Sequence, residues 1–215
     1  MKKYEFTDET VVVNCITLRR IRALKSFRDV KAGELGGFLE EESNLSQEGL
    51  SWIYDSASVF GSASVFGDAS VFGSASVYGS AIVYGSASVY GDARVCGSAR
   101  VCGDVRVYGS ASVYGDARVC GDVRVCDSAR VCGDARIYNN KAIHWIPNIG
   151  SRNDTSTFFV GKDRQVYVTC GCFYGTLDEF SEAVEKEHGN DEYGEVYRKA
   201  IELERVRIVI PEEEL

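Results

Sequence analysis

The 215-residue sequence has few of the residues that metal sites, membrane spans and disulfide scaffolds require. It contains two prolines, one methionine and two histidines, so a site built from three imidazoles is excluded. No apolar run approaches the roughly 18 residues of a transmembrane helix, and MKKYEFTDET carries charges where a signal peptide would be apolar. Eight cysteines fall below the roughly 8–10% that marks a disulfide scaffold. We therefore expect a soluble, cytoplasmic protein with reduced thiols.

Basic charge is also in short supply. The 24 Lys and Arg residues face 32 Asp and Glu residues, which gives a net charge of −8. This balance argues against a protein that coats a nucleic acid polymer. The composition, 45% apolar and 26% charged, is that of a folded globular chain.

What the sequence has in abundance is a repeat. Fourteen consecutive hexapeptides run without insertion from Asp55 to Tyr138, among them GSASVF, GDARVC and GDVRVY. Gly with Ser or Asp supplies a turn, and the next four residues alternate as in a strand. Ala and Val then point to one side, and Ser or Arg with Tyr, Phe or Cys to the other. Such strands can wind as a coil in which each strand stacks on its equivalent in the next turn.

The run resembles the hexapeptide repeats of left-handed parallel β-helix proteins, in which three hexapeptides close one triangular coil. The resemblance implies that residues eighteen apart lie above one another at about 4.8 Å, with Val and Ala inside. We therefore predict a mainly β fold: a left-handed parallel β-helix over 49–143, an N-terminal β cap over 1–48 and a small C-terminal αβ domain over 144–215. Aromatic rings on the outer faces need cover, and the habit of the resembled family predicts a homotrimer.

The outer rows include an unbroken stack of arginines. Like charges at this spacing repel, so something must compensate them. One answer is internal, because five of the seven repeat arginines follow an Asp by two positions. The other is an anionic ligand, since arginine forks beside aromatic faces suit a phosphate-bearing base. The candidate ligand-binding residues in the repeats are Arg100, Arg118, Arg136, Tyr84 and Tyr138.

The cysteines and histidines predict no catalytic residue, metal or cofactor. Cys102 and Cys120 lie one coil apart, within disulfide range, but parallel side chains and a reducing compartment favour free thiols that pack as apolar groups. The Cys-Gly-Cys at 170–172 would be half of a metal site without its second pair. Acyltransferases of the resembled family use a His as general base, yet the repeats contain none. His144, just after the last coil, is more typical of a packed or capping residue.

The flanks are less regular. Residues 11–14 and 16–24 read as strands, and 31–38 as a turn-rich segment. In the tail, strands are expected at 155–160, 165–173 and 206–210, with helices at 176–186 and 191–204. Ser-Arg-Asn-Asp at 151–154 is either a turn or part of a binding surface, and Arg152 and Asn153 are its candidate ligand-binding residues.

We therefore predict an oligomeric binding protein without enzymatic activity. FRDVKAGELGGFLEEESNLSQEGLSWIYDSA and the tail motifs IGSRNDTSTFF and CGCFYGTLDEF resemble segments of uncharacterised bacterial and phage proteins. The resemblance implies a phage-derived counter-defence factor in the host bacterial cytoplasm that sequesters an anionic nucleotide-type host immune signal. Two alternatives stay open: an inhibitor that binds a host defence protein through the C-terminal domain, and a degenerate hexapeptide acyltransferase. Neither a nucleic acid polymer nor a membrane is expected as a partner.

Overall fold

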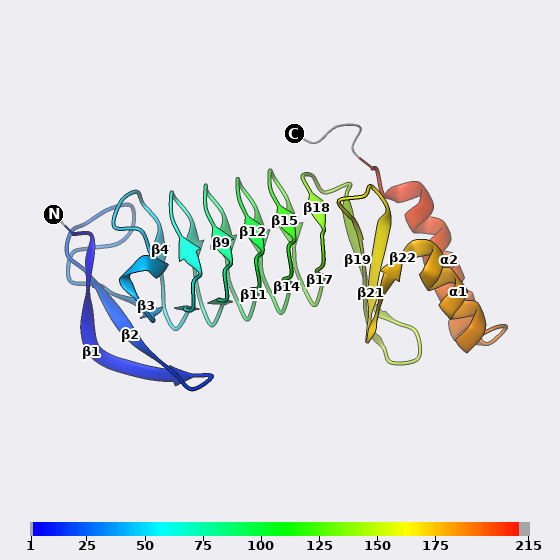
Figure 1. Cartoon of the computed structure of the whole chain (residues 1–215), viewed down its shortest axis with the longest axis horizontal. Helices are drawn as coiled ribbons and strands as arrows, with labels where there is room; N and C mark the ends of the chain where they lie inside the picture. The colour runs from blue at the N-terminus through cyan, green and yellow to red at the C-terminus, as the bar shows by residue number, and fades with distance from the viewer. Residues whose placement is uncertain (1, 211–215) are drawn as a thin grey trace.

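The hexapeptides wind into a parallel β-helix that forms the middle of the molecule (Figure 1). The computed structural model describes residues 2–210. Strands eighteen residues apart pair in register, so that Val101 lies opposite Val83 on one side and Val119 on the other. The coil makes about six turns, and the predicted parallel β-helix with a small C-terminal αβ unit is confirmed.

Three columns of short strands form the three faces. The first column contains β3 (Leu35–Leu39), β5 (Ser58–Val59), β8 (Ser76–Val77), β11 (Arg94–Val95), β14 (Ser112–Val113) and β17 (Arg130–Val131). The second contains β4 (Trp52–Ile53), β7 (Ser70–Val71), β10 (Ser88–Val89), β13 (Arg106–Val107) and β16 (Arg124–Val125). The third contains β6 (Ser64–Val65), β9 (Ile82–Val83), β12 (Arg100–Val101), β15 (Arg118–Val119) and β18 (Arg136–Ile137).

The interior of the coil is a column of small and branched side chains. Repeat residues such as Ala99 and Val101 are completely buried, as the alternation of the hexapeptide predicts. Each buried valine contributes roughly 1.5–3 kcal/mol relative to an exposed one. Because every turn repeats the same contacts, the coil gains stability in equal steps along its axis.

The outer aromatic rings stack on one another from coil to coil. The stacked pairs, with centroids 4.4–5.1 Å apart, are Tyr54–Phe72, Phe60–Tyr78, Phe66–Tyr84 and Tyr90–Tyr108. The hairpin of β1 (Tyr4–Val13) and β2 (Ile16–Ala23) covers part of one face, where Leu18 and Phe38 bury Phe60. Phe66 and Tyr114 stay 40% and 36% exposed. Flanking segments therefore cover some of the rings, and the homotrimer stays a prediction.

The segment 31–38, expected as turns, contains strand β3 and starts the coil earlier than residue 49. Gly36 and Gly37 lie in this strand, where the backbone of the next turn comes too close for a side chain. A Cβ on Gly36 would lie 2.7 Å from the Ile53 carbonyl oxygen, and one on Gly37 would lie 2.4 Å from that of Ala57. A 3-10 turn (Glu42–Asn44) follows, and the buried Asn44 amide donates to the Gly61 and Ala63 carbonyls at 2.9 and 2.8 Å.

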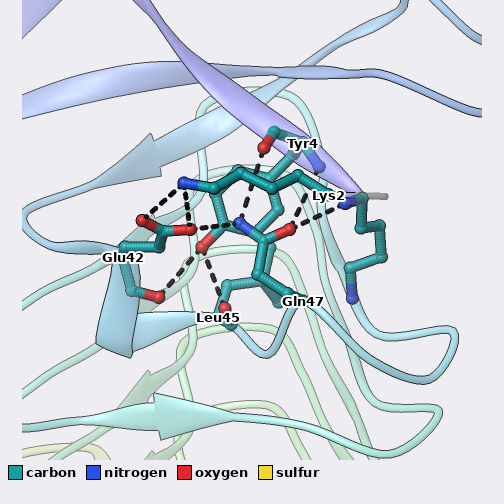
Figure 2. Close-up of polar contacts among 6 residues, drawn as sticks. Lys2, Tyr4, Glu42, Leu45 and Gln47 are labelled. Atoms are coloured by element: carbon teal, nitrogen blue, oxygen red, sulfur yellow. Dashed lines mark hydrogen bonds and ion pairs between the residues drawn. The ribbon is translucent and has the colours of Figure 1, made fainter.

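The N-terminal strand is fastened to the first coil by a polar cluster, which Figure 2 shows. The Tyr4 hydroxyl donates to the carbonyl oxygens of Glu42 and Leu45 at 3.0 and 2.9 Å. Gln47 Oε1 accepts from the backbone N–H groups of Lys3 and Tyr4, at 2.7 and 3.3 Å. Lys2 pairs with Glu42 at the surface. These bonds satisfy polar groups at the first coil edge, as a cap must.

The last coil is closed by side chains from the C-terminal unit. Thr157 Oγ1 accepts from the Arg130 N–H at 3.0 Å, and Thr169 Oγ1 donates to the Arg130 carbonyl at 2.9 Å. On the next face, Asn140 accepts from the Arg124 N–H and donates to the Asp122 carbonyl. These three side chains replace the strand that a further coil would have supplied.

The C-terminal unit is an antiparallel sheet of β19 (Ile143–Ile149), β20 (Asp154–Val160), β21 (Val166–Cys170) and β22 (Phe173–Thr176), covered by α1 (Leu177–Glu187) and α2 (Glu192–Arg207). The predicted capping box at Thr176 and Glu179 is confirmed. The expected strand at 165–173 is a hairpin, because Gly171 has a positive φ of 58° and reverses the chain. The strand expected at 206–210 is wrong, since α2 continues to Arg207. Neither helix within residues 2–210 is long and apolar enough to cross a membrane.

Lys3 makes the stability of the N-terminal cap depend on pH. The side chain is fully buried, and its ammonium donates to the Ser51 carbonyl at 2.9 Å, to Ser51 Oγ at 3.2 Å and to the Glu48 carbonyl at 3.3 Å. Burial lowers the pKa of Lys3 to about 8, and the charge of Lys25 adds a smaller effect in the same direction.

We predict that the free energy of unfolding rises with pH above about 8. The unfolded pKa is 10.5, so between the two values the unfolded chain binds more protons than the folded protein. Urea unfolding from about pH 7.5 to 9.5 should show a gain on the order of 1–2 kcal/mol over the Lys3→Met variant. The same pH dependence in both proteins would contradict this assignment.

Candidate functional site

The structure brings four of the predicted ligand-binding residues to one place. Arg100, Arg118, Tyr84 and Tyr138 line a depression of about 370 Å³ on the face formed by β12 and β15. The other residues of its lining are Cys102, Cys120 and Gly121. We call it the arginine depression. Residues eighteen apart lie in register here, so the two guanidinium groups project side by side from adjacent coils.

The repeat arginines are not neutralised by the aspartates of their own coils. Within residues 2–210, the one repeat arginine in an ion pair is Arg130, with Asp154 of the C-terminal unit at 3.9 Å. The expected pairing of Asp with the Arg two positions later is therefore wrong. The Asp lies at the corner and the Arg on the following strand, so the change of direction separates them. Arg100 and Arg118 are exposed and unpaired in this described region, which leaves their charges available to an anion.

Arg136, the third member of the predicted stack, lies outside this depression. The residue is 8% exposed, and its guanidinium donates to the carbonyl oxygens of Asp116, Asp134 and Ala135 at 3.0, 3.2 and 2.9 Å. Arg136 therefore satisfies backbone acceptors at the end of the coil. Of the arginine stack, Arg100 and Arg118 line the arginine depression, and Arg136 does not.

Cys102 and Cys120 form a disulfide, against the expectation of free thiols. Their Cα atoms are 4.6 Å apart, as in-register stacking requires, and within the range that a disulfide spans. The argument from parallel side chains overlooked that a rotation about each Cα–Cβ bond brings the two sulfurs together. The bond links two successive coils inside the arginine depression.

A second candidate site lies where the last coil meets the C-terminal unit. The junction depression, of about 440 Å³, is lined by Asp122, Arg124, Asn140, Ile143, His144, Trp145 and Arg207. His144 comes from β19, Arg124 from β16 and Arg207 from the end of α2. Residues from three distant parts of the sequence therefore share one space of ligand size.

His144 is held by a buried carboxylate. Its Nδ1 is hydrogen-bonded to Glu204 of α2, whose side chain is completely buried. Glu204 Oε2 is also buried and has no hydrogen-bond partner within the described residues. A buried carboxylate is costly unless it is paired, so the imidazole is its compensation. The pairing fixes the ring and leaves Nε2 as the nitrogen that can act on a bound molecule.

Charged side chains surround His144 in the junction depression. Arg124 and Arg207 place two positive charges there, and Asp122 places one negative charge. The Trp145 indole donates to Asp127 at 2.9 Å, which holds its ring at the wall. A base that is oriented by a carboxylate, next to cations, is the arrangement that general acid–base chemistry on an anionic substrate needs.

Sequence reasoning missed this pair because its members are sixty residues apart. A signal was available. Glu204 follows Tyr197 and Ile201 on the apolar stripe of α2, where a charged residue is out of place. A carboxylate on the buried face of a helix indicates a partner in the segment that the helix covers.

The remaining candidates, Arg152 and Asn153, are separated by the structure. Arg152 lines the tail depression, a space of about 550 Å³ between β21, β22 and the two helices, together with Cys170, Cys172, His188 and Tyr197. Asn153 is a turn residue with a positive φ of 51°, and its N–H donates to the Gly150 carbonyl. Within residues 2–210, no group of three or more His, Cys, Asp or Glu side chains could hold a metal ion.

Comparison with known proteins agrees with this fold. A family model described as the YdcK beta solenoid repeat matches residues 99–115 and 117–133. The matched model describes a β-solenoid repeat, which agrees with the parallel coil of this structure. A relative named "Uncharacterized acetyltransferase YdcK" from Escherichia coli (strain K12) is 36% identical in an alignment of 67 residues, which covers 27% of this chain. The match spans about a fifth (21%) of the length of that relative.

This comparison corrects one expectation. The comparison contradicts the prediction of a protein without enzymatic activity, because the similarity is to a protein named as an acetyltransferase. The prediction depended on the lack of histidine within the coils. It also interpreted His144, just after the last coil, as a packed or capping residue, whereas the structure hydrogen-bonds its ring to the buried Glu204.

The two kinds of arginine in the stack can be distinguished by stability. We expect Arg136→Gln to lower the free energy of unfolding by about 1–3 kcal/mol, because buried carbonyl groups lose their donor. Arg100→Gln, in the same stack but exposed, should stay within about 0.5 kcal/mol of the wild type. Denaturant unfolding of both variants measures this. Equal losses would contradict the separate roles.

Proposed function

We propose that this protein is an acyltransferase-type enzyme whose catalytic base is His144. The observation that carries the proposal is the bond from the buried Glu204 carboxylate to His144 Nδ1, at the wall of the junction depression. The name of the E. coli relative supports the same class of reaction.

The chemistry follows from the geometry. Nδ1 of His144 is held by Glu204, so Nε2 accepts the proton of an acceptor amine or hydroxyl as that group attacks a thioester carbon. The proton is then available to the departing thiolate. The donor of such a reaction, a coenzyme A thioester, carries phosphates, and Arg124 and Arg207 are the residues in the junction depression that would bind them.

A nucleotide-type anion is also the ligand that the arginine depression favours. Two unpaired guanidinium groups with a tyrosine above and a tyrosine below fit a phosphate and an aromatic base. We propose capture of such an anion there as a second function. Its use as a counter-defence device against a host immune signal, in the host cytoplasm, stays a prediction from the resemblance to phage-borne chains.

The partners of the protein are proposals too. Exposed rings such as Phe66 and Tyr114 support self-association into a trimer. Val196, Leu203 and Val206 are exposed along α2 and support a protein partner at the C-terminal unit.

The acyltransferase proposal is tested by incubating the protein with acetyl coenzyme A and a panel of amine and hydroxyl acceptors, with product detection by mass spectrometry. We expect His144→Gln to lower the rate about 10²–10⁴-fold, and Glu204→Gln to lower it less, because the base remains but loses its orientation. His188→Gln is the matched control and should keep full activity. Consumption of no donor with any acceptor, or an unchanged rate in His144→Gln, would remove the proposal.

Anion capture is tested separately by calorimetric titration with a panel of nucleotides, including cyclic ones. We expect the double variant Arg100→Gln/Arg118→Gln to weaken binding at least tenfold, since each charge-assisted hydrogen bond is worth about 1.5–3 kcal/mol. Arg94→Gln/Arg106→Gln, on the other two faces, should bind as the wild type does. Absence of heat across the panel would rule out this function without affecting the first.

A further inference from the structure

The Cys102–Cys120 disulfide is open to attack from the arginine depression. Cys120 is half-buried and Cys102 is 8% exposed, and both line a space of about 370 Å³. This volume is within the usual range for a small-molecule site. A disulfide with access for a small thiol can exchange, whereas one in the interior of the coil could not.

The other cysteines of the repeats lack this arrangement. Cys96, Cys126 and Cys132 each lie in register with tyrosines of the neighbouring coil, and all three are free thiols. Burial raises the pKa of the Cys126 and Cys132 thiols, which makes them poor nucleophiles. The hexapeptides place two cysteines eighteen residues apart once, at 102 and 120. Only there can successive coils be joined through sulfur.

The surroundings of this pair are cationic. Arg100 and Arg118 stand two residues before each cysteine, so they share the outer face of their strands with the sulfurs. Both are exposed, and neither is in an ion pair in the part of the chain that the structure describes. Positive charge stabilises a thiolate leaving group and concentrates anions near it.

We propose that Cys102–Cys120 is a thiol–disulfide exchange site for an anionic low-molecular-weight thiol, a carboxylate-bearing thiol of the glutathione type. The carboxylates bind Arg100 and Arg118, and the thiol reaches the sulfur that is more exposed. The proposal does not depend on acyl transfer at His144, which is placed in a different depression.

The exchange proceeds in two displacements. The thiolate of the small thiol attacks Cys120 Sγ, a new S–S bond forms, and Cys102 leaves as a thiolate beside the two arginines. A second thiolate attacks the sulfur of the bound small thiol, which releases the small-molecule disulfide and the Cys120 thiolate. In total two thiols lose two electrons and two protons, and the protein gains them as its dithiol. The reverse sequence restores the disulfide.

The test compares thiols that differ in charge. The intact protein is incubated with mercaptoacetate, glutathione, mercaptoethanol or cysteamine, quenched by alkylation, and the peptides that contain Cys102 and Cys120 are quantified by mass spectrometry. Rates are normalised to the reaction of each thiol with a neutral model disulfide. We expect the anionic thiols to react about tenfold faster than the neutral one, with the cationic thiol slowest.

Two pairs of variants locate the effect. Arg100→Gln/Arg118→Gln should abolish the charge preference, and Arg94→Gln/Arg106→Gln should keep it. Cys120→Ser should form no mixed disulfide at this site, whereas Cys96→Ser should react normally, and circular dichroism melts confirm that each variant is folded. The proposal fails if millimolar thiol leaves the Cys102–Cys120 bond intact in the folded protein, or if the normalised rate does not depend on the charge of the thiol. It also fails if oxidised glutathione does not re-form this disulfide in the purified dithiol protein. Because the readout is sulfur chemistry, its failure is distinct from a failure of nucleotide binding.

Discussion

In-register stacking at a period of eighteen residues is the constraint on which this structure depends. Each inner strand of the coil pairs with the equivalent strands above and below it, so each residue lies against the residue 18 positions away in the neighbouring turn. Inside, this rule produces a column of valine and alanine with no exposed surface. Outside, it makes stacked rings, stacked arginines and, at one place, a covalent link between coils. The surface chemistry of the coil is thus a consequence of backbone pairing.

The same rule leaves backbone N–H and C=O groups without a neighbouring strand at the two ends of the coil, and the flanking segments supply their hydrogen-bond partners. At one end, Asn44 and the cluster around Tyr4 occupy the polar groups of the first turn. At the other, Thr157, Thr169 and Asn140 supply the bonds of a missing strand. Closure of the second end brings β19 and α2 against the last coil, which assembles His144 with Glu204. A regular stack has little room for unique side-chain combinations, so the oriented base forms where the regularity stops.

How far the sequence predicted this molecule depended on whether a feature was local and periodic. The buried Val and Ala rows follow from the hexapeptide alone, and so does the alignment of Arg100 with Arg118. Gly36 and Gly37 were misinterpreted as a turn, because the close approach of Trp52 and Ala57 that requires glycine is a tertiary contact.

The features that were missed all depend on contacts that the order of residues does not show. The Cys102–Cys120 bond follows from side-chain rotation, which a pattern of residue types does not contain. Arg136 has the same place in the repeat as Arg118, yet the end of the coil gives it backbone carbonyls to bind. Glu204 lies sixty residues from His144, and only the packing of α2 on β19 makes them neighbours.

The side-chain closure at the last coil has one more implication. Thr157 and Thr169 bind the backbone N–H and C=O of a single residue, Arg130. Equivalent N–H and C=O groups are presented by every turn of this column, so these two bonds do not require a particular turn. Duplication or loss of one 18-residue unit would lengthen or shorten the column by about 4.8 Å while both ends keep their fastenings. The distance between the N-terminal hairpin and the junction depression can therefore change during evolution in steps of one coil.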